Sequence, residues 1–180
     1  MDIVNSLVEG GKFLHAHALV IGSGGNLSIR ESNFFTIKRG GADMSKANTE
    51  DYIKIPFSPS APPEDSRLSS ESLLHWACYA SKGDVRAVAH AHPPYAIRAA
   101  RRRNVLKSAS YEFDCLVGPS IPVIPYLGPG SRELSDAVAA KIGSGETAVL
   151  MKRHGIVAVG ESIEQACNRI LAVERACMTL

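Results

Sequence analysis

The sequence has no long apolar run, no surplus of charge of one sign and no closely spaced pair of cysteines. No hydrophobic stretch approaches the roughly 18 residues that a membrane-spanning helix needs. The N-terminus also lacks the charged and then unbroken apolar regions of a secretory signal. The 20 Lys and Arg residues nearly balance the 18 Asp and Glu residues, which leaves a net charge of +2 at pH 7. We therefore expect neither a membrane nor a nucleic acid as the partner.

The four cysteines are widely separated, and C-x-x-C spacing does not occur among Cys78, Cys115, Cys167 and Cys177. This spacing gives no indication of a thiolate zinc site or a redox motif. Most of them lie in apolar runs, where a free thiol behaves as a small hydrophobic side chain. We expect reduced, structural cysteines and a cytoplasmic location.

What is present is the composition of an ordinary globular protein, with 45% hydrophobic and 21% charged residues over 180 positions. The length predicts one domain over residues 1–180 with a single sizeable core. Short apolar or alternating runs predict strands at residues 26–30, 33–37, 52–55, 85–90, 121–124, 147–151 and 156–159. Periodicity and start signals predict helices over 2–19, 71–83, from 93 onward, 131–142 and from 162 to the C-terminus.

Hairpins outnumber β-α-β units in this order, so the predicted class is α/β with a mixed sheet and helices on its faces. Three local features carry further expectations. Gly10 and Gly11 are expected to interrupt the first helix. Pro122 marks the strand at 121–124 as an edge strand. Ser162 and Gln165 fit a capping box.

Two H-x-H pairs, His15–His17 and His90–His92, differ in what their predicted elements allow. Residues i and i+2 of a helix point about 200° apart, so His15 and His17 are expected to be ordinary helix residues. Alternate residues of a strand share a face, so His90 and His92 can bind one metal ion. The alternative for His90 and His92, a solvent-facing strand end, is weakened by the buried-looking run that precedes them.

A catalytic zinc site needs three protein ligands and an open position. His154 is the candidate third ligand, because it lies beside Gly155 in a turn between two predicted strands. His75 is a rival, since it shares a helix face with Glu71 at i, i+4. A core or helix-surface position is the stronger expectation for His75.

Two short segments have features of an anion site. The loop Gly22–Asn26 follows an apolar run, but Leu27 occupies the third glycine position of G-x-G-x-x-G and a strand follows it. This loop is therefore either an anion nest or a simple helix C-cap and turn. Ser69 and Ser70 precede a helix and offer hydroxyl and N–H groups that suit a phosphate, although capping alone also explains them.

Taken in order, these motifs resemble the class II aldolase and adducin family, nearest to fuculose-1-phosphate aldolase-like proteins. The resemblance covers nearly the whole chain and depends on GSGGNLS at 22–28, SSE at 69–71, HAHP at 90–93, IPY at 124–126, PGSREL at 129–134 and RHG at 153–155. It implies an α/β/α layer with a mainly antiparallel central sheet. It also implies a homotetramer with sites between subunits.

The resemblance further implies residue roles. His90, His92 and His154 match the histidines that hold a divalent metal ion, usually zinc. Glu71 matches the acid/base, which can also occupy the metal in the substrate-free state. Tyr111 matches by spacing a tyrosine that assists proton transfer from a neighbouring subunit. The implied phosphate and substrate contacts are Ser23, Gly24, Asn26, Ser69 and Ser70, with Lys38, Arg39 and Gly40 where the family commonly has a Thr/Ser-Gly segment.

The activity implied is metal-dependent cleavage of a ketose 1-phosphate, a sugar phosphate, to dihydroxyacetone phosphate and an aldehyde through an enediolate, without a lysine Schiff base. The alternatives on the same scaffold are a pentulose-phosphate 4-epimerase and a methylthioribulose-1-phosphate dehydratase. A non-catalytic, adducin-like interaction domain would be expected to have lost the metal ligands, which are retained here. The chain ends at Leu180, and the tail that covers the site in longer members is expected to be missing. The specificity for the aldehyde half of the substrate is therefore left open.

Overall fold

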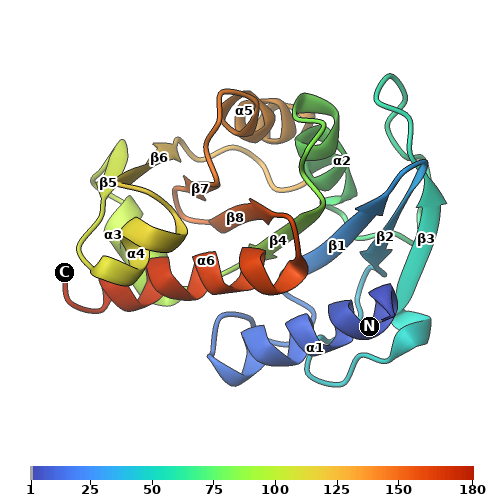
Figure 1. Cartoon of the computed structure of the whole chain (residues 1–180), viewed down its shortest axis with the longest axis horizontal. Helices are drawn as coiled ribbons and strands as arrows, with labels where there is room; N and C mark the ends of the chain where they lie inside the picture. The colour runs from blue at the N-terminus through green and yellow to red at the C-terminus, as the bar shows by residue number, and fades with distance from the viewer. Residues whose placement is uncertain (1) are drawn as a thin grey trace.

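The computed structural model of the chain describes residues 2–180, and its framework is a sheet with the strand order β3-β2-β1-β4-β8-β7-β6-β5 (Figure 1). Only β6 and β7 pair in parallel, and all other neighbours in the described sheet are antiparallel. The strands are β1 (Asn26–Glu31), β2 (Phe34–Lys38), β3 (Tyr52–Pro56), β4 (Ala87–Ala91), β5 (Val105–Lys107), β6 (Ser120–Ile124), β7 (Ala148–Met151) and β8 (Gly155–Gly160).

Helices cover both faces of this sheet (Figure 1). One face packs against α2 (Ser72–Ser81) and α5 (Arg132–Gly143). The other packs against α1 (Ile3–Ala16), α3 (Pro94–Ala100), α4 (Tyr111–Leu116) and α6 (Ile163–Cys177). A short 3-10 helix, Thr49–Asp51, precedes β3. The two helix layers around a mainly antiparallel sheet confirm the expected α/β/α class. Among residues 2–180, no helix has both the length and the apolar character needed to cross a membrane.

The central strands β4 and β8 are buried on both faces, and their side chains alternate between the two helix layers. In β8, Ile156 and Ala158 pack in the core on the α6 side, whereas Val157 and Val159 pack in the core on the α2 side. In β4, Val88 faces the α2 layer. Because side chains of a strand repeat with period two, residues 90 and 92 continue on that same face.

The first helix differs from its prediction, because α1 runs through Gly10 and Gly11 without a break. Both glycines are buried. A Cβ atom at Gly10 would lie 3.1 Å from Leu27 Cδ1 and 3.2 Å from Ile163 Cγ1. The glycines therefore let α1 approach the sheet and α6 closely, and the prediction of an interruption was wrong.

The edge assignment also differs, because β6 lies inside the sheet and β5 forms its edge. Pro122 causes no loss of pairing. It pairs with Val105 of β5, while pairing with β7 begins only at Val123. Val123 N donates to Asn104 O on the β5 side, so the nitrogen of Pro122 faces the β7 side before that ladder begins. A proline is tolerated there because no ladder hydrogen bond needs its N–H.

The helix starts agree only in part with the sequence patterns. Ser162 Oγ accepts a hydrogen bond from Gln165 N at 3.1 Å, as predicted, but Gln165 Oε1 accepts from Glu161 N and not from Ser162 N. The N-cap of α2 is Glu71, and its side chain makes no capping hydrogen bond. The Glu71 carboxylate is therefore available for another role.

Candidate active site

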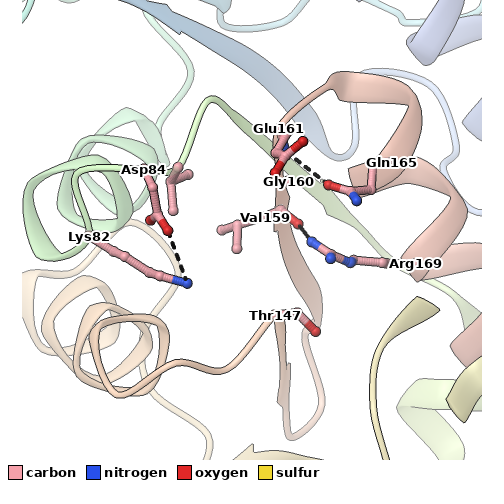
Figure 2. Close-up of a pocket in the computed structure, with 9 residues that line it drawn as sticks. Lys82, Asp84, Thr147, Val159, Gly160, Glu161, Gln165 and Arg169 are labelled. Atoms are coloured by element: carbon pink, nitrogen blue, oxygen red, sulfur yellow. Dashed lines mark hydrogen bonds and ion pairs between the residues drawn. The ribbon is translucent and has the colours of Figure 1, made fainter. Parts of the chain in front are cut away.

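A cavity of about 130 Å³ at the end of β8 is lined by residues such as Lys82, Val159 and Arg169 (Figure 2), and none of the predicted site residues lines it. Several of its polar groups already have partners within the fold. Lys82 Nζ lies 3.7 Å from Asp84 Oδ2, and Arg169 Nη1 donates to Val159 O. The predicted site residues lie instead at the opposite end of β8, where Gly155 begins the strand.

His90 is held in place by the β4–β8 pairing at that opposite end. It pairs with Val157 in the register of the two strands, and its buried ring places Nδ1 2.9 Å from Ile156 O. A carbonyl oxygen can only accept, so Nδ1 carries a proton. Nε2, which lies near Glu71 Oε2 and His92 Nε2, is therefore the ring nitrogen available to a metal ion once it has no proton of its own. The sheet therefore sets the tautomer that metal binding requires.

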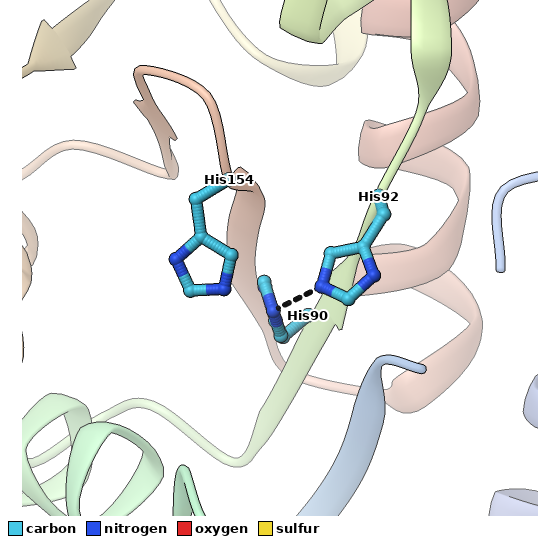
Figure 3. A group of neighbouring side chains, drawn as sticks. All are labelled: His90, His92 and His154. Atoms are coloured by element: carbon cyan, nitrogen blue, oxygen red, sulfur yellow. Dashed lines mark hydrogen bonds between the residues drawn. The ribbon is translucent and has the colours of Figure 1, made fainter. Parts of the chain in front are cut away.

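His92 and His154 bring their rings to the same point (Figure 3). Nε2 of His92 lies 2.9 Å from Nε2 of His90, and one ligand atom from each of the three histidines lies within 4.8 Å of the others. His154 reaches this point from the turn between β7 and β8, where Arg153 adopts a positive φ of 61° and His154 N donates to Met151 O. The three predicted ligands thus lie together.

Glu71 completes the cluster from the start of α2. Its Oε2 lies 2.8 Å from His90 Nε2, and its Oε1 lies 3.3 Å from His154 Nε2. Burial by itself raises the pKa of Glu71, but the charge and hydrogen bond of His90, with the charges of the other nearby histidines, together outweigh burial and lower that pKa to about 2. Glu71 is therefore a carboxylate at neutral pH.

The donor set fits a divalent cation. Glu71 Oε1 is buried and has no hydrogen-bond partner within the described part of the chain, a costly state for a carboxylate oxygen. Burial also lowers the pKa of His92 to about 4, which keeps its imidazole neutral and able to bind a metal. Three imidazoles and a carboxylate at one point are ligands that zinc and similar ions prefer.

The glycine loop at residues 22–25 lies directly against the histidines. A Cβ atom at Gly25 would lie 2.7 Å from His90 O, and one at Gly24 would lie 3.2 Å from His92 Nδ1. Gly22 and Gly25 have positive φ values of 55° and 70°, which favour glycine. The loop therefore brings backbone and the exposed Ser23 to the edge of the cluster.

Lys38 is hydrogen-bonded to this loop from the buried end of β2. Its side chain is buried, and its Nζ donates to Ser23 O at 3.0 Å and to Ala42 O at 2.6 Å. Burial lowers the pKa of Lys38. The ammonium group thus ties two loops together, while Arg39 and Gly40 beside it are exposed.

Asn26 and Ser69 lie next to the histidines and contact each other. Asn26 pairs with His90 in the β1–β4 register, and its Nδ2 donates to Ser69 Oγ at 2.9 Å. Both side chains are nearly buried. Ser70 is exposed and follows Ser69 in the segment that leads into α2. The predicted phosphate residues of both segments therefore lie beside the metal-ligand cluster.

Other candidates lie elsewhere. Tyr111 begins α4, is 79% exposed and has no hydrogen bond or ion pair with the cluster within residues 2–180. His15 and His17 are exposed at the end of α1, as expected of ordinary helix residues. His75 is a fully buried core residue that contacts Ser28 and Asn26. Those partners are 47 and 49 positions away in the chain, so sequence spacing holds no sign of them.

Comparisons with known proteins show the family of the chain. A family model described as Class II Aldolase and Adducin N-terminal domain matches residues 5–180. An L-fuculose phosphate aldolase of Methanococcus maripaludis is 30% identical over 166 residues, which are 92% of this chain and 88% of that protein. A 5-deoxy-D-ribulose 1-phosphate aldolase of Bacillus thuringiensis is 30% identical over 162 residues, which are 89% of this chain and 75% of that protein.

Solved structures give the same result for the fold. The L-fuculose-1-phosphate aldolase from Thermus thermophilus superposes with a TM-score of 0.91 at 24% identity, over 98% of this chain and 91% of that chain. A structure of an L-fuculose 1-phosphate aldolase with 31% identity superposes with a TM-score of 0.86, over 99% of this chain and 84% of that chain.

Proposed function

Because the chain belongs to the class II aldolase and adducin family, we propose that it cleaves a ketose 1-phosphate reversibly to dihydroxyacetone phosphate and an aldehyde. The observation that carries this proposal is the convergence of the Glu71 carboxylate on His90 and His154. That arrangement places an acid/base group within reach of any substrate oxygen or carbon held at the histidines.

His90, His92 and His154 would hold a zinc ion, which supplies Lewis-acid stabilisation of the negative charge that develops on the ketose oxygens. Cleavage breaks the C3–C4 bond, removes the proton of the C4 hydroxyl and adds a proton at C3. Glu71, as a carboxylate shielded from bulk water, is placed to carry the proton at C3. This route uses no covalent bond between substrate and protein.

The phosphate end of the substrate is assigned to the two segments beside the cluster. Asn26 and Ser69 supply side-chain donors, and Ser23 and Ser70 supply exposed hydroxyls. Gly24 and Gly40 let the backbone come close to the phosphate, while their own N–H groups bond Ile21 O and Arg67 O. Arg39 is exposed beside them and adds a positive charge that can reach a phosphate oxygen. Lys38 holds the loop that carries Ser23.

A homotetramer in the cytoplasm is the proposed setting. Tyr111 is exposed and separate from the cluster of its own chain, which supports a role for it in the site of a neighbouring copy. The four cysteines are unpaired, as expected in a reducing compartment. Light scattering of the purified protein tests the assembly, and a monomer with full activity would contradict the role of Tyr111.

The decisive test is metal analysis of the purified protein followed by assay of L-fuculose 1-phosphate and 5-deoxyribulose 1-phosphate. We expect a bound divalent ion, and release of dihydroxyacetone phosphate with an aldehyde from at least one of the two. A protein that binds no metal and leaves both substrates intact would overturn the proposal. Conversion to an epimer or loss of water without C–C cleavage would replace it by one of the alternative activities.

A further inference from the structure

A line of buried polar side chains runs from α2 through β1 to the proposed phosphate end of the site. Tyr79 Oη lies 2.7 Å from Ser28 Oγ, and Ser28 Oγ lies 2.6 Å from His75 Nδ1. His75 Nε2 is hydrogen-bonded to Asn26 Oδ1, and Asn26 Nδ2 lies 2.9 Å from Ser69 Oγ. We call these five residues the relay.

The relay has one direction. The amide oxygen of Asn26 can only accept, so His75 Nε2 carries the proton and donates it. His75 Nδ1 is then the acceptor, and Ser28 must donate to it. Ser28 Oγ in turn accepts from the hydroxyl of Tyr79. The hydroxyl and ring N–H donors of Tyr79, Ser28 and His75 thus all have acceptors, a condition that buried polar networks need for stability.

The direction decides what the last two residues offer to a ligand. Ser69 Oγ accepts from Asn26 Nδ2 and, at 3.4 Å, from the backbone N–H of Glu71. Its own hydroxyl proton is therefore left to be donated, and Asn26 keeps a second N–H. If the Asn26 amide were turned over, its oxygen would face Ser69 and accept the hydrogen bond from the Ser69 hydroxyl. That hydroxyl could then no longer donate to an anion.

We propose that His75 is a positioning residue of the phosphate end: by donating to Asn26 Oδ1 it holds the Asn26 amide so that Asn26 and Ser69 both present hydrogens to a phosphate. The inference rests on the proposed function for the location of the phosphate. His75 itself is 0% exposed, and its side chain is hydrogen-bonded to Ser28 and Asn26 and to none of the three metal-site histidines. It therefore reaches a bound ligand only through Asn26.

Three variants test this role. His75→Leu removes the donor to Asn26. His75→Gln retains one donor and one acceptor, since a glutamine amide can donate to Asn26 Oδ1 and accept from Ser28. Cys78→Ala is the matched control, because Cys78 is equally buried on the same face of α2 and belongs to no part of the relay.

Calorimetric titration of the metal-loaded protein with inorganic phosphate gives the first readout. We expect His75→Leu to bind phosphate at least tenfold more weakly than the wild type, and His75→Gln to stay within threefold of it. Cys78→Ala should lower the melting temperature without changing phosphate affinity. In the cleavage assay, the loss in His75→Leu should appear in KM more than in kcat. Equal phosphate affinity in His75→Leu and Cys78→Ala would overturn the proposal.

The tautomer of His75 gives a readout that needs neither a substrate nor a foldable variant. Nitrogen-15 NMR of the wild type should show His75 with its proton on Nε2, and a proton on Nδ1 would overturn the relay direction. Wild-type protein that binds no phosphate would also overturn the inference. Failure of the proposed function can be distinguished from failure of this inference. In that case the ketose 1-phosphates stay intact, although phosphate binding and the His75 tautomer are as expected.

Discussion

The carboxylate of Glu174 in α6 accepts a hydrogen bond from the backbone N–H of Ala96 in α3, with Glu174 Oε2 2.8 Å from Ala96 N. Its other oxygen accepts from Tyr95 N at 3.0 Å. The residue at the N-cap of α3 is Pro93, whose side chain cannot accept a hydrogen bond. A residue 78 positions away in sequence therefore caps the helix that follows His92, one of the proposed metal ligands.

We expect Glu174→Ala to lower the free energy of unfolding by about 2 kcal/mol, because the N–H groups of Tyr95 and Ala96 lose a charged acceptor. Glu174→Gln retains one acceptor oxygen and should lose less. Urea denaturation measures both. A Glu174→Ala variant as stable as the wild type would show that water satisfies the start of α3 equally well.

The same residue predicts a pH dependence. Burial raises the pKa of Glu174 and outweighs the lowering by the Tyr95 and Ala96 amides. A folded pKa above the unfolded one makes the wild type gain stability as pH falls through the folded value, and lose it as pH rises. Glu174→Gln does not titrate. The melting temperature of the wild type relative to this variant should therefore be higher at pH 5 than at pH 7.5.

Glu71→Gln should retain the metal and lower kcat by about 10²- to 10⁴-fold, because an amide keeps the shape of the side chain but cannot carry the proton. Metal content and kcat measured on the same preparation check both parts. A variant with full turnover would remove Glu71 from the acid/base role.

His154→Ala should lose most of the bound metal, because one of the three converging imidazoles is removed. His15→Ala is the matched control, since His15 is exposed at the end of α1 and should leave the metal content unchanged. Elemental analysis after dialysis decides between them. Equal metal content in the two variants would show that His154 is not needed to bind the metal ion.

Thiol titration should distinguish the four cysteines. Cys115 is exposed, whereas burial raises the pKa of Cys78 and of Cys167 to about 12 and that of Cys177 to about 11. Only Cys115 should react quickly with a disulfide reagent in the folded protein. All four should react in denaturant, and rapid reaction of a buried thiol under native conditions would indicate local opening.

Short-range patterns predicted what depends on a single element. The period of a strand places His90 and His92 on one face, and the turn between two strands delivers His154, as the structure has it. The same patterns gave wrong predictions where the role of a residue depends on a partner far away in the sequence. Gly10 serves a contact with Ile163, and Pro122 is accommodated by a strand that starts 17 positions earlier at Val105.

Short elements and buried charged side chains also could not be predicted from the sequence. The three-residue β5 and the six-residue α4 carry too little periodicity to be recognised. Lys38 was expected at the phosphate itself, by comparison with a Thr/Ser-Gly segment. The structure instead buries it beneath the loop, on carbonyl groups that only the folded chain brings together. The role of Tyr111 stays a prediction, because it depends on another copy of the chain.

The register of β4 against β8 limits how this sequence can diverge. A slip of one residue between them would turn the His90 side chain to the opposite face of the sheet and would part its Nδ1 from Ile156 O. Insertions or deletions inside these two strands should therefore be as damaging as loss of a histidine. We expect length variation among natural homologues to gather at the outer edge around β5 and in the exposed segment 58–67, where the chain can lengthen without displacing a ligand.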